Sequence, residues 1–184
     1  HALARRAAGE SVVLLKNDGA LLPIEPAGDG SIAVIGEFAR TPRFQGAGSS
    51  QVNPIHVEVA LDEITAIVGE SRVTFAPGYR IGRRDTDDDI AQLIGQAVAA
   101  AASAETVVCF LGLPAHFESE GFDRTHLRLP DAQLRLIAAV AAANPRVVVV
   151  LVNGSTVEMA TWIDHAPTVL ECWLGGQAVA SPTC

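Results

Sequence analysis

Short apolar runs recur along the chain, and the segments between them carry apolar residues at helical spacing. The runs are rich in β-branched residues, which is typical of buried strands. Apolar positions three and four residues apart predict amphipathic helices in the intervening segments. The expected strands are residues 31–36, 73–76, 106–112, 146–153 and 168–174, and the expected helices are residues 3–15, 57–68, 86–104 and 131–143.

Strands and helices alternate along most of the chain. Alternation of this kind produces βαβ units with right-handed crossovers, so the strands run parallel in one sheet with helices on both faces. The sequence therefore predicts an α/β fold, a three-layer sandwich with a mostly parallel central sheet. With 184 residues, of which 49% are hydrophobic, the chain suits one core, and we expect residues 1–184 to form a single domain. Residues 175–184 look like the start of a helix, so we expect this domain to be truncated at its C-terminal end.

Composition excludes several classes of partner. The formal net charge is −8, and clustered Lys and Arg, which a nucleic acid or an anionic membrane needs, are lacking. No apolar run approaches the roughly 20 residues of a membrane span. Cys109 and Cys172 lie in apolar strands and are expected to be buried thiols, and with Cys184 they support neither a disulfide framework nor a zinc site. His116 and His126 lack a third ligand, so we expect no metal and no cofactor.

Three loops follow predicted strands and carry unusual residues: 37–54, 113–130 and 153–155. In a parallel sheet such loops meet at the carboxyl edge, where ligands bind. The second loop is dense in titratable groups, with Glu118 and Glu120 near phenylalanine rings. Crowded carboxylates beside apolar rings tend to raise the pKa of one of them, as a general acid for glycoside cleavage requires. On composition alone, a solvated acidic loop with a structural Asp123–Arg124 pair is the more frequent arrangement.

Short motifs occur in a fixed order along nearly the whole chain. They are residues 7–17 (AAGESVVLLKN) with 21–23 (LLP), 33–36 (AVIG), 46–50 (GAGSS), 118–124 (ESEGFDR) with 129–130 (LP) and Gln133, 147–152 with 153–154 (NG), and Trp173 with 175–177 (GGQ). In this order and spacing they resemble the second domain of family 3 glycoside hydrolases of the β-glucosidase type. None of the motifs would suffice singly, whereas together they are specific.

The resemblance implies a retaining hydrolase that acts on a β-linked glycoside or oligosaccharide. A TIM barrel would supply an aspartate nucleophile, and this domain would supply the acid/base carboxylate. Since no barrel motif is present in these residues, the barrel is an expected partner in cis or in trans, and the chain alone is expected to be inactive. The acid/base is expected to be Glu120, with Glu118 as the alternative for the same role. Asp123 and Arg124 would shape the loop, and Phe117 and Phe122 would line a sugar subsite or anchor the loop.

Two other functions remain open on sequence. A non-catalytic module that binds sugar or packs on a protein would share these motifs. A flavodoxin-like or nucleotide-binding domain would share the alternating pattern, but residues 35–38 hold one glycine where a dinucleotide fingerprint needs several. The 46–50 loop lacks the lysine of a phosphate cradle and is expected near a domain interface. Trp162 and Trp173 are expected in the core rather than as sugar platforms.

Overall fold

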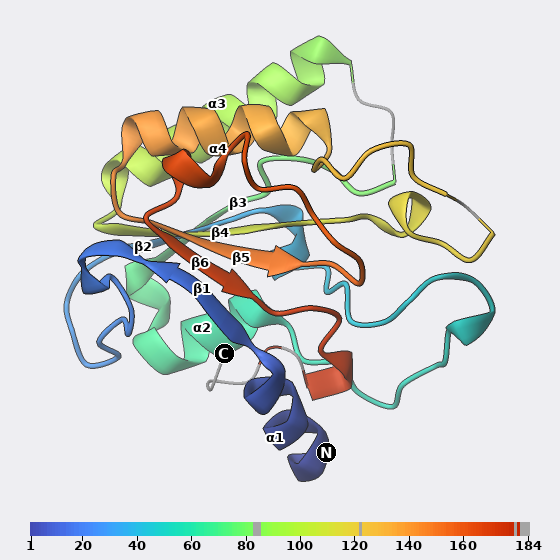
Figure 1. The fold of residues 1–184 in the computed structure, drawn as a ribbon. Helices are drawn as coiled ribbons and strands as arrows, with labels where there is room; N and C mark the ends of the chain where they lie inside the picture. Colours follow the sequence, from blue (N-terminus) through green and yellow to red (C-terminus); the bar gives the residue numbers. More distant parts are fainter. Residues whose placement is uncertain (83–85, 122, 179, 181–184) are drawn as a thin grey trace.

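The computed structural model describes residues 1–82, 86–121, 123–178 and 180, and confirms the α/β sandwich (Figure 1). In this part of the chain six strands form one sheet in the order β1-β6-β5-β4-β2-β3. The strands β2 to β6 are parallel to their neighbours, and β1 is antiparallel to β6. The strands are β1 Val13–Asn17, β2 Ile32–Ile35, β3 Val73–Ala76, β4 Thr106–Gly112, β5 Val147–Val152 and β6 Thr168–Glu171.

Helices cover both faces of the sheet (Figure 1). The pair α3 and α4 lies against one face, α2 lies against the opposite face, and α1 extends from the start of β1. Within the described ranges, none of these helices combines the length and the apolar character needed to cross a bilayer. The helices are α1 Ala2–Ser11, α2 Ala60–Val68, α3 Asp87–Ser103 and α4 Asp131–Ala143.

The central strands β4 and β5 form the middle of the core. Every residue of both strands is buried, as expected for apolar, β-branched runs that are covered on both faces. The alternating polar pattern of a half-exposed strand is absent from these two runs for the same reason. The core therefore fixes the carboxyl ends of β4 and β5 side by side, and this sets the position of the loops that follow them.

The start of the chain differs from the prediction. Residues 3–15 were expected to form one helix, but α1 ends at Ser11 and β1 begins at Val13. The β-branched pair Val12 and Val13 favours extended backbone, and β1 gains its hydrogen bonds by pairing antiparallel with β6. Tertiary pairing thus overrides the helical spacing of the apolar residues, and the helix prediction is wrong over its last turn.

The start of α3 agrees with its acidic sequence. The Asp89 amide donates to the Thr86 hydroxyl at 3.2 Å, and the Thr86 amide donates to the Asp89 carboxylate at 3.2 Å, which makes a reciprocal capping box. The Thr86 hydroxyl and amide, with a smaller contribution from Arg80, lower the pKa of the Asp89 carboxyl. The N-terminus of α3 is therefore fixed by its own side chains.

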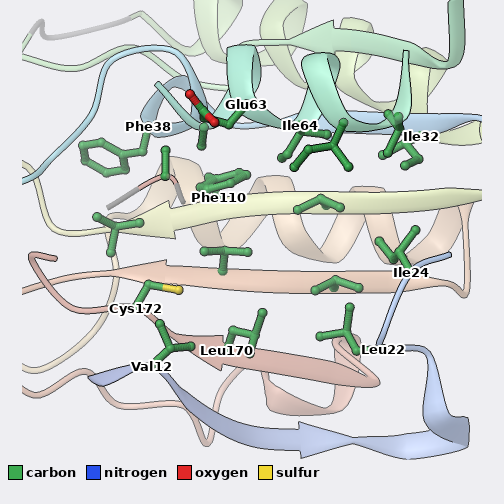
Figure 2. Close-up of a pocket in the computed structure, with 18 of the residues that line it drawn as sticks. Val12, Leu22, Ile24, Ile32, Phe38, Glu63, Ile64, Phe110, Leu170 and Cys172 are labelled. Carbon is green, nitrogen blue, oxygen red and sulfur yellow. The ribbon is translucent and has the colours of Figure 1, made fainter. Parts of the chain in front are cut away.

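An apolar cavity of about 510 Å³ lies between α2 and the sheet. Figure 2 shows side chains such as Phe110 and Leu170 extending from the strands toward it, with Glu63 at its α2 side. Among the described lining residues only Arg43 and Glu63 are charged. Sugars are oriented in proteins by several convergent polar groups. We therefore place the candidate site at the polar loops and not in this cavity.

Candidate functional site

The three loops that the sequence places at strand ends do meet in the structure. The Arg43 side chain, on the loop after β2, donates from Nε to the Leu113 carbonyl at 3.3 Å. A parallel bridge joins Ala47 to Ser119 on the loop after β4. The Gly154 amide, on the loop after β5, donates to a carboxylate of the loop after β4. These contacts build one cluster at the carboxyl edge of the sheet. We call the three segments, residues 37–54, 113–130 and 153–155, the site loops.

The Glu118 carboxylate lies inside the cluster. Its side chain is 10% exposed and accepts hydrogen bonds from the Gly154 amide at 2.9 and 3.1 Å and from the Ser155 hydroxyl at 2.8 Å. Arg43 lies 3.5 Å from the same carboxylate, through Nη2, and is itself 9% exposed. Burial lowers the pKa of the Arg43 guanidinium, and the Glu118 carboxylate opposes this effect. Glu118 therefore has protein partners on both of the neighbouring site loops.

The Glu120 carboxylate lies at the surface of the same cluster. It accepts hydrogen bonds from the Ser49 amide at 2.9 Å and from the Ser49 hydroxyl. These two donors, the hydroxyl first and then the amide, lower the pKa of the Glu120 carboxyl because they stabilise its charged form. Glu120 is thus exposed to solvent and bound to one serine of the facing loop.

The pattern of pKa shifts differs from the expectation for the loop. Crowding was expected to raise the pKa of one of its carboxyls, but the pKa of Glu120 is lowered. A carboxyl whose pKa is raised is that of Glu171, at the end of β6. Burial is the largest cause of the rise, and the charge of Glu118 adds to it. The Trp173 amide and the Asn153 side chain donate to Glu171 and partly offset that rise. Burial raises the pKa of Glu120 by less than the two Ser49 hydrogen bonds lower it.

Arg124 holds its loop through partners other than the expected one. Its Nη2 donates to the Ser155 hydroxyl at 3.0 Å and to the Thr156 carbonyl at 2.7 Å. No ion pair joins Arg124 to Asp123 in the part of the chain that the structure describes, so the expected pair is not formed. Arg124 Nη1 and Asn153 Oδ1 are buried without a hydrogen-bond partner in the structure. The cluster therefore retains hydrogen-bonding capacity at two buried atoms.

The two aromatic residues expected at a sugar subsite have different outcomes. Phe117 packs against the edge of the core and contacts the His116 ring, with ring centroids 4.9 Å apart. It also lines a small cavity of about 160 Å³ together with Tyr79 and Gln133. Phe122 lies outside the described residues. Phe117 thus anchors the loop, and its contact with a sugar stays a prediction.

Several residues of the cluster were not found by sequence reasoning. Arg43 and Ser155 were placed in loops at strand ends but were given no role, and Ser49 was assigned only to a loop near a domain interface. The order of the 46–50 motif in the chain was the available signal, but it does not say which residue the serine contacts. Trp162 is a core residue, as expected. Trp173 is 41% exposed and donates from its ring to the Ser11 carbonyl, so its assignment to the core was wrong.

Cys109 lies in β4 and Cys172 directly after β6, whereas His116 and His126 lie on the loop after β4. Cys109 and Cys172 are buried, as expected, and Cys184 lies outside the described residues. Burial raises the pKa of the Cys109 thiol to about 12, which keeps it protonated and unreactive. Within the described ranges, no group of three or more His, Cys, Asp or Glu side chains is arranged to hold a metal ion. The chemistry available at the site loops is therefore that of carboxylates, hydroxyls, guanidinium groups and the imidazoles of His116 and His126.

Comparison with known proteins identifies the family of this fold. The family described as "Glycosyl hydrolase family 3 C-terminal domain" matches residues 12–182. The chain is 47% identical over 180 residues to thermostable β-glucosidase B of Acetivibrio thermocellus, covering 97% of this chain and 23% of that protein. It is 46% identical over 183 residues to an exo-α-(1→6)-L-arabinopyranosidase of Bifidobacterium longum, covering 96% and 24%. The chain thus spans about a quarter of the length of these relatives.

Solved structures agree with this assignment. The Bifidobacterium adolescentis GH3 β-glucosidase superposes with a TM-score of 0.88 at 46% identity, covering 99% of this chain and 26% of that one. DesR, a β-glucosidase from Streptomyces venezuelae in complex with D-glucose, gives a TM-score of 0.88 at 27% identity, covering 97% and 35%. The matched family, the relatives and the fold agree, and the chain therefore belongs to glycoside hydrolase family 3, as a C-terminal domain of its β-glucosidase-like enzymes.

Proposed function

We propose that this domain supplies Glu120 as the general acid/base of a retaining glycosidase whose active site is completed by another domain. The observation that carries the proposal is the contrast between the two candidate carboxylates. Glu118 is almost buried and bound by two site loops, whereas Glu120 is exposed at the carboxyl edge and, among the described residues, accepts its hydrogen bonds from Ser49. A group that must reach a glycosidic oxygen needs the accessible position.

The proposed reaction uses Glu120 in two steps. Its carboxyl group donates a proton to the glycosidic oxygen while a carboxylate of the other domain attacks the anomeric carbon, so the glycosidic bond breaks and a glycosyl ester forms. Glu120, now a carboxylate, then takes a proton from the water that attacks the same carbon. This second step releases the sugar and restores both groups to their starting forms.

The lowered pKa of Glu120 must be offset before this carboxyl can act as a general acid. A carboxyl that is ionised at neutral pH is a poor proton donor. A second carboxylate at about 5 Å, the separation used in retaining enzymes, favours the protonated form of its neighbour. Glu120 therefore acquires acid character when the nucleophile-bearing domain approaches and the Ser49 contact is exchanged. On this basis the isolated chain does not hydrolyse glycosides.

The substrate class follows from the relatives. Those relatives carry the names of a β-glucosidase and an exo-α-(1→6)-L-arabinopyranosidase, yet each is almost half identical to this domain over the matched segment. A domain that is so similar in enzymes named for different sugars does not select the sugar. We propose that this domain serves the hydrolysis of terminal β-linked sugars, in line with its β-glucosidase relatives, and that the barrel selects the sugar, since another relative is named for an α-linked arabinopyranoside.

A non-catalytic role is the second candidate. The observation in its favour is that both carboxylates of the loop have protein partners in this chain and that the pKa of Glu120 is lowered. In that case the site loops would bind sugar or pack on a partner without proton transfer. The two candidates differ in whether Glu120 is needed for turnover.

Co-expression with a family 3 barrel that lacks its second domain tests the proposal. The expected result is no release of 4-nitrophenol from 4-nitrophenyl β-glucoside by either part alone and turnover by the complex. Glu10→Ala, on the exposed face of α1, is the matched control and should leave the turnover unchanged. Turnover by the purified chain alone would contradict the division of the site, and full turnover by a Glu120→Ala complex would favour the non-catalytic role.

A further inference from the structure

We propose that Glu118 is a positioning residue, whose carboxylate fixes the backbone segment that carries Glu120. The proposal rests on the proposed function of Glu120 and gives its neighbour a different task. Glu118 does not exchange a proton with substrate in this account. It holds the acid/base in place by joining the three site loops.

The contacts of Glu118 reach two loops that are distant in sequence. Hydrogen bonds from Gly154 and Ser155 attach it to the loop after β5. Its ion pair with Arg43, at 3.5 Å, attaches it to the loop after β2. Because both side chains of this pair are about nine-tenths buried, water competes little for either charge. The carboxylate is therefore a junction between all three site loops.

The same junction reaches both sides of the contact between Ser49 and Glu120. Only Ser119 separates Glu118 from Glu120, and Ser119 bridges to Ala47. Arg43 also donates to the Gln45 carbonyl, so it restrains the segment that leads to Ser49. Glu118 thus restrains the acid/base through its own backbone and restrains the facing serine through Arg43.

The surroundings of Glu118 argue against the acid/base role for this residue. Both of its oxygens already accept hydrogen bonds from the loop after β5. To reach a glycosidic oxygen it would have to leave these donors and expose the Arg43 charge. Positioning of a catalytic group matters greatly for rate, since a displacement of about 1 Å can cost on the order of a hundredfold. The buried Glu118, which accepts hydrogen bonds at both oxygens, therefore fits the positioning role, and the exposed Glu120 fits the acid/base role.

Amide hydrogen exchange on the 184-residue chain tests the junction without any catalysis. The Gly154 amide donates to Glu118 and the Ser49 amide donates to Glu120, so each reports on one carboxylate. Glu118→Ala should speed exchange at both amides by on the order of tenfold, because a hydrogen bond to a charged group is lost and the loops separate. Glu120→Ala should speed exchange at Ser49 alone. Unchanged exchange at Ser49 in the Glu118→Ala chain would overturn the proposal.

Kinetics of the complex with the barrel give a second, independent readout. Glu118→Gln keeps the size of the side chain and loses its charge, so it serves if Glu118→Ala does not fold. We expect kcat to fall by about 10- to 100-fold with little change in KM and with the basic limb of the pH profile retained. Loss of that limb in Glu118→Gln would show that Glu118 itself titrates in catalysis and would overturn the proposal.

The two proposals fail in different ways. If Glu120→Ala leaves the basic limb and the rate unchanged, the acid/base assignment fails, whereas the exchange experiment still decides whether Glu118 joins the loops. If exchange at Ser49 does not respond to Glu118, the positioning role fails while the Glu120 assignment stands on its own kinetics. Glu10→Gln is the control for both experiments, because the Glu10 side chain is 73% exposed and pairs with Arg6 within α1.

Discussion

Gly36 directly follows β2 and begins the loop that carries Arg43 and Ser49, and it is a position where any side chain should be harmful. Its φ of 109° and ψ of 131° lie outside the regions open to other residues. A Cβ atom built there would lie 2.2 Å from the carbonyl oxygen of Phe110, in the backbone of the buried strand β4. We therefore expect Gly36→Ala to disturb both the loop and the β2–β4 pairing.

The size of the effect follows from these two causes. Backbone strain at such a φ costs about 1–3 kcal/mol. Relief of the overlap with a strand that cannot move costs about another 1–3 kcal/mol, the range for overpacked cores. The free energy of unfolding should thus fall by about 2–6 kcal/mol, a large part of the total for a domain of this size.

Urea denaturation followed by tryptophan fluorescence measures this change. Two other glycines serve as controls. Gly19→Ala has a positive φ but open space, so it should cost about 1 kcal/mol, and Gly95→Ala lies within α3 with open space and should stabilise by about 0.5–1 kcal/mol. A Gly36→Ala chain within about 0.5 kcal/mol of the original chain, at equal m value, would refute the reasoning.

Three further predictions concern side chains. Burial raises the pKa of Glu171, so the folded chain holds that proton more tightly than the unfolded chain, and stability is lost as pH rises above about 4.3. Glu171→Gln should therefore gain stability relative to the original chain between pH 4 and pH 7, as measured by urea titrations. A stability difference that stays constant over this pH range would contradict the prediction. Thr86→Ala removes the capping box of α3 and should lower the unfolding free energy by about 1 kcal/mol, whereas an unchanged midpoint would show that the cap is dispensable. Ser49→Ala removes the first cause of the lowered pKa of Glu120, so the pKa should rise in a ¹³C NMR titration, and no rise would show that the contact is not formed in solution.

Most of the fold could be predicted because the core strands are recognisable in the sequence as short, continuous apolar runs. The runs that became β4 and β5 are apolar throughout, and tertiary contacts reinforce what their residues already favour. The strand β1 could not be found in this way. Its apolar residues also satisfy helical spacing, and only pairing with β6, more than 150 residues away, decides between the two structures.

The candidate site was predictable in its chemistry and not in its contacts. Motif order brought attention to the acidic loop and to the 46–50 segment, but the contact from Ser49 to Glu120 depends on how two loops fold over one edge. The difference between Glu118 and Glu120 is likewise a matter of burial, which two glutamates in one loop do not reveal. Arg124 was expected to pair with its neighbour, yet its guanidinium donates to Ser155 and Thr156 once the loops meet.

The central claim is that Glu120 is the acid/base of a site completed by another domain. The most direct measurement is azide rescue of 4-nitrophenyl β-glucoside hydrolysis by the complex with the barrel, comparing Glu120→Ala with Glu118→Ala. An external nucleophile replaces the missing base only where the acid/base itself has been removed. We predict that azide restores turnover and yields glucosyl azide with Glu120→Ala, and that it restores nothing with Glu118→Ala. Rescue of Glu118→Ala alone would contradict the account.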